Sequence, residues 1–135
     1  MDTSAHRISI SSGTHWEAMA GYARAMRIGE RILVSGTTAT DIDRVVAPGD
    51  PAAQTHFIID KLEAAINQLG GTLADVVRTR IYVRDIKDWE AVARVHGERF
   101  AAIRPVNTLV QAILVGEEYL VEMEAEAIIG AGHAL

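Results

Sequence analysis

The 135-residue sequence predicts an α+β domain, with one mixed β-sheet and two helices on one of its faces. Three observations predict this class. Several short segments alternate polar and apolar residues or are rich in β-branched residues, as strands are. Two longer segments repeat apolar residues at helical spacing. The segments follow one another as βββαβαββ without a repeat or linker, which predicts a single domain spanning residues 1–135.

Three strands are predicted before the first helix, at residues 7–10, 22–28 and 31–35. The first alternates polar and apolar side chains. The second and third flank the turn-forming pair Gly29-Glu30, which predicts a hairpin. A loop containing Trp16 is expected between the first two strands, and residues 41–48 are expected to form another loop.

The two helices are predicted from capping residues and apolar periodicity. Asp50 can cap the first helix, Pro51 suits its first position, and Gly70-Gly71 ends it. Its apolar positions are Phe57, Ile58, Leu62, Ala65, Ile66 and Leu69. Asp88 is expected to cap the second helix. The apolar face of that helix is predicted to contain Trp89, Val92, Val95, Phe100 and Ile103.

Three further strands are predicted at residues 76–84, 107–113 and 119–129. On the last of them, the side chains that share one face, about 6.6 Å apart, are Glu122, Glu124 and Glu126. The strand at 76–84 presents on one face Arg78, Arg80, Tyr82 and Arg84. Two interpretations of these acidic and basic rows stay open. They form cross-strand ion pairs on an exposed face, or neighbouring subunits cover the face and part of it lines a cleft.

Charge and composition argue against several partners. The net charge is −5, so neither nucleic acid nor an anionic membrane is expected as a partner. The chain has no cysteine, and its five histidines lack metal-site spacing, so neither a metal nor another cofactor is expected. Residues 1–7 lack the apolar core of a signal peptide, and no apolar run reaches about 18 residues. A cytoplasmic protein is therefore expected.

Glu122 is the candidate for proton transfer, because a partly desolvated carboxylate has a raised pKa and can hold or activate water. Its neighbours Glu124 and Glu126 are the same residue type, so type alone does not single it out. Ser35-Gly36 is either a plain strand end or a hydroxyl and backbone N–H site for a carboxylate or carbonyl. Trp16 either packs on the core or forms one wall of an apolar pocket.

Several motifs, in order and spacing, resemble the RidA/YjgF family, also labelled endoribonuclease L-PSP, over residues 12–127. No single motif carries this resemblance. The most informative pieces are Val34-Ser35-Gly36, Arg104-Pro105-Val106-Asn107-Thr108 and Val121-Glu122-Met123-Glu124-Ala125. Weaker pieces are Gly21-Tyr22, Gly70-Gly71, Val77 to Val83 and Glu98-Arg99-Phe100.

The resemblance implies a chorismate-mutase-like fold assembled as a homotrimer, with clefts between the subunits. In deaminating members of the family, an arginine binds the carboxylate of a 2-imino or 2-enamino acid, and a glutamate positions the hydrolytic water. Glu122 matches this glutamate. The matching cleft positions are Tyr22, Ser35, Gly36 and Thr108.

Two departures from the family pattern matter. Asn107 occupies the position of the arginine, and Ala93 stands where deaminases often carry an asparagine. A neutral amide cannot replace the charge of a bidentate arginine, and the loss of such a partner costs about 2–5 kcal/mol. The chain therefore resembles a divergent branch that lacks the signature arginine. Whether Arg24, Arg27 or Arg104 reaches the site instead is left open.

Three functions stay open. The first is a trimeric enzyme that hydrolyses a small imine, enamine or related C–N bond, but not the usual 2-imino acids. The second is a non-catalytic protein that binds a small metabolite or regulates. The third, an endoribonuclease, is disfavoured by the acidic charge and the lack of a basic-aromatic stripe. The candidate catalytic residue is Glu122, and the candidate binding residues are Trp16, Tyr22, Ser35, Gly36, Asn107 and Thr108.

Overall fold

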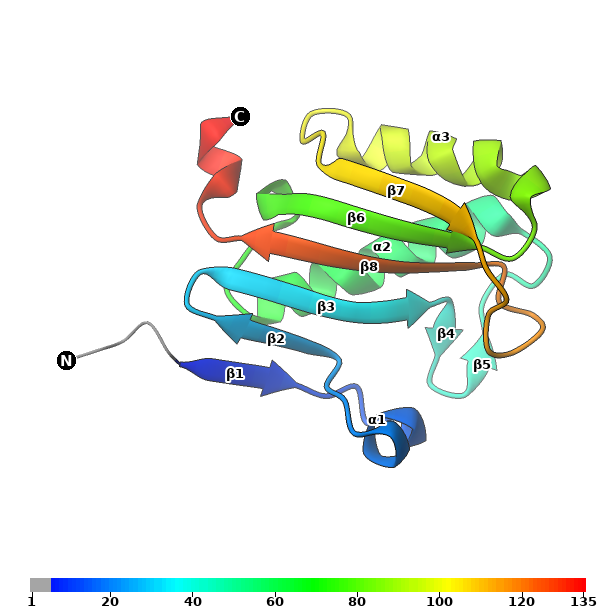
Figure 1. The fold of residues 1–135 in the computed structure, drawn as a ribbon, viewed down its shortest axis with the longest axis horizontal. Helices are drawn as coiled ribbons and strands as arrows, with labels where there is room; N and C mark the ends of the chain where they lie inside the picture. The colour runs from blue at the N-terminus through cyan, green and yellow to red at the C-terminus, as the bar shows by residue number, and fades with distance from the viewer. Residues whose placement is uncertain (1–5) are drawn as a thin grey trace.

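The computed structural model describes residues 6–135, which form a six-stranded sheet covered on one face by two long helices (Figure 1). The strands of this sheet are β1 (Arg7–Ile10), β2 (Ala25–Ile28), β3 (Arg31–Thr38), β6 (Val76–Val83), β7 (Val106–Gln111) and β8 (Val121–Ile128). Their order is β1-β2-β3-β8-β6-β7. Only β6 and β7 pair in parallel. The predicted mixed sheet and α+β class are confirmed.

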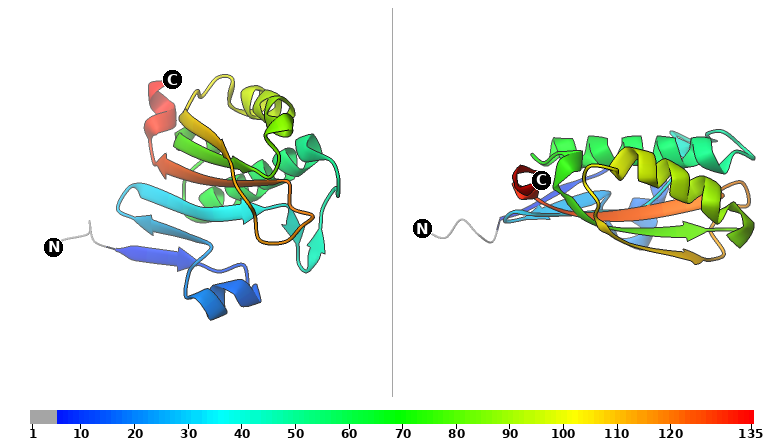
Figure 2. Two further views of the ribbon diagram at one scale, coloured as in Figure 1. Left: turned by 45° about the vertical axis from the view of Figure 1, so that its right-hand side comes forward. Right: turned by 90° about the horizontal axis from the view of Figure 1, so that it is seen from above.

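The two long helices are α2 (Pro51–Gln68) and α3 (Trp89–Phe100), and both lie on the same side of the sheet (Figure 2). Asp50 caps α2 as predicted, since its carboxylate accepts from the Ala53 N–H at 3.0 Å. The predicted cap at Asp88 is wrong. Asp88 already has helical backbone angles because it ends the short 3₁₀ turn η2 (Ile86–Asp88). The side chain that caps there is Asp85, which accepts from the Lys87 N–H at 2.9 Å.

The hydrophobic core lies between the helices and the sheet. The fully buried apolar side chains of α2 include Ile58, Leu62 and Ile66. Each buried side chain of this size contributes about 1.5–3 kcal/mol. On β8 the core side chains are Val121, Met123, Ala125 and Ala127, and the glutamates point to the open face, as predicted. On α3 the apolar stripe is shorter than predicted, because Trp89 is 50% exposed.

A short helix, α1 (His15–Ala20), lies where the sequence predicts a loop. Six residues are too few to show helical periodicity. Gly21 ends this helix with φ at +75°, so β2 begins at Ala25 rather than at residue 22. The carboxylate of Glu17, on α1, accepts from the backbone N–H of Ser12 at 3.1 Å and from the Ser12 hydroxyl. This fixes the segment that enters the helix.

A small hairpin, β4 (Thr40–Asp41) and β5 (Arg44–Val45), forms where the second loop was expected. Each strand has two residues, too few for an alternation pattern. In addition, β3 runs on to Thr38, three residues beyond its predicted end. These two differences place the hairpin at the carboxyl end of β3, next to the site described below.

The C-terminal segment is tied to the body of the domain through Asp75, in the 3₁₀ turn η1 (Leu73–Asp75). Its buried carboxylate accepts from the backbone N–H groups of Thr72, Gly130 and Gly132 at 2.9–3.2 Å. The last turn, η3 (Ala131–Ala134), is held there. The N-terminal segment considered for a signal peptide lies mostly in residues 1–5, outside the described residues. Within residues 6–135, no helix combines the length and apolar character needed to span a membrane.

Candidate functional site

A β-bulge interrupts β3 where it pairs with β8. Val34 lies opposite Ala125, but the next paired residue of β3 is Thr37, opposite Met123. Ser35 and Gly36 therefore lie inside a strand, not at a strand end as predicted. Bulges often redirect side chains beside functional sites.

The bulge holds Ser35 through its own hydrogen bonds. The Ser35 hydroxyl donates to the Ala23 carbonyl at 2.7 Å, and its backbone N–H donates to the Arg24 carbonyl at 3.0 Å. The segment before β2 is thereby attached to β3. Arg24 and Gly36 consequently lie near each other.

Gly36 lies directly against the side chain of Glu122. A β-carbon at Gly36 would overlap Oε2 of Glu122 and would lie 3.1 Å from its carboxyl carbon. The position of the carboxylate therefore depends on the absence of a side chain at residue 36.

Glu122 differs from the two other glutamates of β8 in its partners. Glu124 accepts from the Tyr82 hydroxyl at 2.8 Å and lies 3.5 Å from Arg80. Glu126 forms an ion pair with Arg31 at 2.6 Å. Within residues 6–135, the half-buried carboxylate of Glu122 has neither a hydrogen bond nor an ion pair. The cross-strand ion-pair interpretation thus holds for two of the three glutamates and leaves Glu122 free, while cover by neighbouring subunits stays a prediction.

The free carboxylate lines a cavity of about 730 Å³, here called the Glu122 pocket. It lies at the carboxyl end of β3, between α1, the β4–β5 hairpin and the loop before β8. Of the predicted site residues, those that line it are Trp16, Tyr22, Gly36 and Glu122. Burial raises the pKa of Glu122, the charge of Arg24 opposes this shift, and the charge of Glu124 adds to it. The pocket therefore holds a carboxylate that keeps its proton to a higher pH than an exposed one.

Two cations share the pocket with Glu122. Arg24 donates from Nη2 to the Gly36 carbonyl at 2.8 Å. Lys61 reaches the pocket from α2 and donates to the carbonyls of Thr38 and Thr40, each at 3.0 Å. Burial and then the charge of Arg24 lower the pKa of Lys61, while Asp41 opposes this. Sequence reasoning left Arg24 open and missed Lys61, which is one of several polar residues beside the apolar stripe of α2.

Hydroxyl groups form a chain along one wall of the pocket. The Thr40 hydroxyl lies 2.8 Å from that of Thr38 and donates to the Tyr119 hydroxyl at 2.9 Å. Sequence reasoning missed all three residues, because their contact depends on how the loop before β8 folds back. The buried Gln54 of α2 holds this loop, since it donates to the Glu118 carbonyl at 3.0 Å and accepts from the Leu120 N–H at 2.9 Å.

Arg84 also shapes this loop. It donates to the carbonyls of Leu114 and Tyr119 at 2.8 Å and of Gly116 at 2.5 Å. Its predicted place in the basic row beside Arg80 is therefore wrong, because β6 ends at Val83 and the chain turns there. Arg84 acts as a loop anchor instead.

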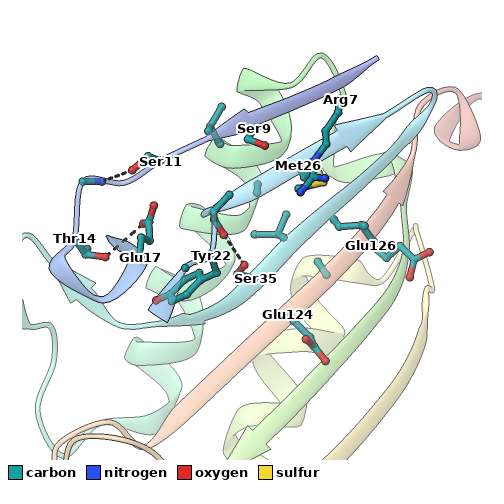
Figure 3. Close-up of a pocket in the computed structure, with 18 of the residues that line it drawn as sticks. Arg7, Ser9, Ser11, Thr14, Glu17, Tyr22, Met26, Ser35, Glu124 and Glu126 are labelled. Atoms are coloured by element: carbon teal, nitrogen blue, oxygen red, sulfur yellow. Dashed lines mark hydrogen bonds between the residues drawn. The ribbon is translucent and has the colours of Figure 1, made fainter. Parts of the chain in front are cut away.

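A second hollow of about 1030 Å³, here called the sheet groove, runs over the open face of the sheet (Figure 3). Ser35 lines this groove, and Tyr22 lines both the groove and the Glu122 pocket. Figure 3 shows Tyr22 and Ser35 on the side of the N-terminal segment, with Glu124 and Glu126 on the other side. Tyr22 thus stands where the two hollows adjoin.

Asn107 and Thr108 line neither hollow. Both lie on the edge strand β7, where Asn107 is opposite Thr79 in the parallel register. The Asn107 amide donates to the Thr79 hydroxyl at 2.9 Å, and this hydroxyl lies 2.8 Å from Nε2 of His96 on α3. The Asn107 side chain is therefore directed towards the helices rather than towards Glu122.

The remaining arginines weighed as substitutes lie elsewhere. Arg27 donates to the carbonyls of Gly29 and Leu69, at 2.8 and 3.0 Å. Arg104 is exposed, has φ at +55° and lines neither hollow. Only Arg24 of the three shares the pocket with Glu122. In the part of the chain that the structure describes, no three acidic or histidine side chains gather as a metal site would require.

Comparison with known proteins agrees with this fold. A family model described as Endoribonuclease L-PSP matches residues 13–129. An uncharacterised protein of Streptomyces coelicolor is 39% identical over 123 residues, covering 90% of this chain and 92% of the relative. The 3-aminoacrylate deaminase RutC of Acinetobacter baylyi is 34% identical over 110 residues, covering 81% of this chain and 87% of the relative.

A solved structure is similar over most of the chain. It is a member of the YjgF/YER057c/UK114 family from Mycobacterium tuberculosis, with a TM-score of 0.84 and 45% identity. The match covers 92% of this chain and all of that one. The fold is thus that of the YjgF-type α+β proteins. The chain belongs to the RidA/YjgF family, the family described as endoribonuclease L-PSP. Membership supports a deaminase-like or related role on a small metabolite.

Proposed function

We propose that this protein hydrolyses a small imine, enamine or related C–N substrate, with Glu122 positioning the attacking water. The observation that carries this proposal is the free, half-buried carboxylate of Glu122 in a cavity large enough for a small metabolite. The two other glutamates of the strand are engaged by Tyr82, Arg80 and Arg31. A carboxylate with no internal partner is suited to bind water and to accept its proton.

Glu122 accepts a proton from water as the water oxygen bonds to the carbon of the protonated C=N group, which gives a neutral carbinolamine. Glu122 then returns this proton to the nitrogen, and the C–N bond breaks. The carbinolamine hydroxyl becomes the carbonyl of the product and passes its proton to the departing ammonia, which leaves as ammonium. An enamine enters the same sequence after protonation at carbon. A raised pKa favours Glu122 as the group that takes up the first proton and returns it.

The comparisons support the class of substrate without supplying its identity. One relative is named a 3-aminoacrylate deaminase, and its substrate contains an enamine. Asn107 is engaged with Thr79, and it stands at the position where the resemblance expects an arginine. The usual 2-imino acids, bound through that arginine, are therefore not the proposed substrates.

We also propose that the protein assembles as a homotrimer in which copies pack on the open face of the sheet. The sheet groove and the exposed apolar side chains of Leu33, Val106 and Val110 support this. A second copy that placed its β7 edge beside the Glu122 pocket would bring Asn107 and Thr108 to the site. Light scattering on the purified protein should give three times the mass of one chain. A monomer at micromolar concentration would contradict the assembly.

Hydrolysis is tested by ammonia release from imines generated freshly in the assay by an amine oxidase. We expect Glu122→Gln to lose about 10²–10⁴-fold in rate, because the proton acceptor is removed. The matched control is Glu90→Gln on α3, which makes the same chemical change but removes only a surface ion pair with Arg94. If wild type adds nothing to the uncatalysed rate, or if Glu122→Gln matches wild type, hydrolysis through Glu122 is wrong.

A non-catalytic metabolite-binding protein is the second candidate. The engagement of Asn107 by Thr79 favours it, since no charged clamp remains at that position. It predicts saturable ligand binding without turnover, and a Glu122→Gln variant that keeps its cellular function. Loss of that function with unchanged ligand affinity would contradict it.

The third candidate, an endoribonuclease, rests on the printed name of the family. The net charge of −5 disfavours it, because phosphate binding needs a basic surface. RNA cleavage that survives repurification and disappears in Glu122→Gln would revive it.

A further inference from the structure

The charged groups of the Glu122 pocket differ in depth. Arg24, Lys61 and Glu122 are half-buried, whereas Asp43, which also lines the pocket, is exposed on the β4–β5 hairpin. The inner part of the pocket thus contains two cations and one carboxylate. The two cations outnumber this carboxylate even when it is ionised, as it must be to accept a proton from water. Among the half-buried groups that line the pocket, positive charge therefore exceeds negative charge. The buried Glu17 and the exposed Asp41 act on Arg24 and Lys61 from outside the lining.

Bringing two cations together is unfavourable unless an anion joins them. Burial and then the charge of Arg24 lower the pKa of Lys61, as a neighbouring cation should. Lys61 is fixed in place by the two threonine carbonyls that accept from its amine. The electrostatic repulsion between Lys61 and Arg24 is consequently a fixed property of this end of the sheet.

The guanidinium of Arg24 is only partly used by the protein. Nη2 donates to the Gly36 carbonyl, while Nε is buried without an acceptor. Within residues 6–135 Arg24 forms no ion pair with any carboxylate. A guanidinium has five N–H donors, and buried donors are normally satisfied. Nε is closed off by the protein, so the donors that remain for a ligand beside Glu122 are Nη1 and the second N–H of Nη2, which have no acceptor within residues 6–135.

We propose that Arg24 determines specificity by binding an anionic group of the substrate, of the size and single charge of a carboxylate, inside the Glu122 pocket. Lys61 adds positive charge to the same pocket, and the exposed rings of Trp16 and Tyr22 border the rest of the ligand. The anion then lies within one subunit, next to the water that Glu122 holds. The reaction in this inference rests on the proposed function. Anion binding does not, because it can be measured without turnover.

The test compares butanoate with butanamide, which differ in charge but hardly in shape. Amide NMR spectra during titration should show butanoate shifting the signals of Gly36 and Thr38, with little effect from butanamide. We expect Arg24→Gln to weaken butanoate binding about tenfold or more, the effect of one charge-assisted contact. Arg24→Lys should restore part of it.

Arg94→Gln is the matched control, because Arg94 lies on α3 and is exposed, with a single ion pair to Glu90. It should bind butanoate like wild type. Equal butanoate affinity in wild type and Arg24→Gln overturns the proposal, as does the absence of shifts at Gly36 and Thr38 on adding butanoate to wild type. The spectrum of each variant also reports whether it is folded.

The experiments can refute the hydrolysis proposal and the anion-site proposal independently of each other. Glu122→Gln should bind butanoate at least as tightly as wild type, because a negative charge beside the anion is removed. Butanoate binding that depends on Arg24, without any ammonia release, would refute hydrolysis and leave the anion site intact. Ammonia release with KM for anionic imines unchanged in Arg24→Gln would refute the anion site and leave hydrolysis intact.

Discussion

The α-carbon of Gly36 lies against the carboxylate of Glu122, across the bulge that interrupts the pairing of β3 with β8. A backbone feature of one strand thereby sets the position of the side chain on its neighbour. Arg24, which binds the Gly36 carbonyl, is placed by the same bulge.

Gly36→Ala should therefore inactivate the protein without unfolding it. The new methyl group meets the movable end of Glu122, so we expect a change of roughly 1 kcal/mol in the free energy of unfolding. Displacement of the carboxylate should reduce ammonia release about 100-fold. Chemical denaturation and initial rates on the same preparation check both parts.

Gly97→Ala is the control for Gly36→Ala. Gly97 is exposed on α3, and a β-carbon there would meet nothing within 4 Å. We expect this variant to be more stable by about 0.5–1 kcal/mol and fully active. A Gly36→Ala variant as active as Gly97→Ala would show that the position of Glu122 does not matter.

Asp75→Asn should loosen the C-terminal segment. Burial alone would raise the pKa of Asp75, but hydrogen bonds from Gly132, Thr72 and Gly130 together lower it below its ordinary value of 3.8. We expect the variant to lose about 1–3 kcal/mol at neutral pH, because three backbone donors lose a charged acceptor. Denaturation with urea, with the exposed Asp43→Asn as control, measures this loss.

The effect of Asp75→Asn should depend on pH. The stabilisation by Asp75 is complete above 3.8 and is lost as the pH falls through the lower pKa of the folded state. The difference between wild type and variant should therefore shrink in strong acid. A difference that stays constant across this range would contradict the proposed role of the carboxylate.

His96 should make the fold less stable in mild acid. Burial lowers its pKa below the ordinary 6.5, so the folded state binds the proton later than the unfolded chain does. Its neutral form contributes fully above 6.5, and this contribution is lost as the pH falls from there through the lower pKa of the folded state. The stability gap between wild type and His96→Gln should narrow as the pH falls below 6.5. A gap independent of pH would contradict a neutral, buried His96.

Strand periodicity predicted the faces of β8 because each face has its own chemistry. Val121, Met123, Ala125 and Ala127 are apolar and buried, and the alternating glutamates must then share the open face. The N-cap of α2 at Asp50 was likewise predicted from residues next to it in the sequence. Such features depend on a few residues that are close together in the sequence, so a local pattern predicts them.

The site depends on contacts that are distant in sequence. The position of Lys61 follows from how α2 crosses the end of β3, and that of Tyr119 from a loop held by Arg84 and Gln54. The direction of Asn107 follows from the parallel register of β7 with β6. Alternation within one strand does not encode which neighbour it pairs with. The open-face position of Glu122 was therefore predicted, and its role stays a prediction, while most of its surroundings could not be predicted.

The pH dependence of kcat/KM for ammonia release tests the role of Glu122 most directly. The group must be ionised to accept a proton from water, and burial raises its pKa above the ordinary 4.5. We predict that the rate rises with pH through a single ionisation above 4.5, and that this step is absent from the residual activity of Glu122→Gln. The same step in Glu122→Gln as in wild type would contradict the assignment of Glu122 as the residue that activates water.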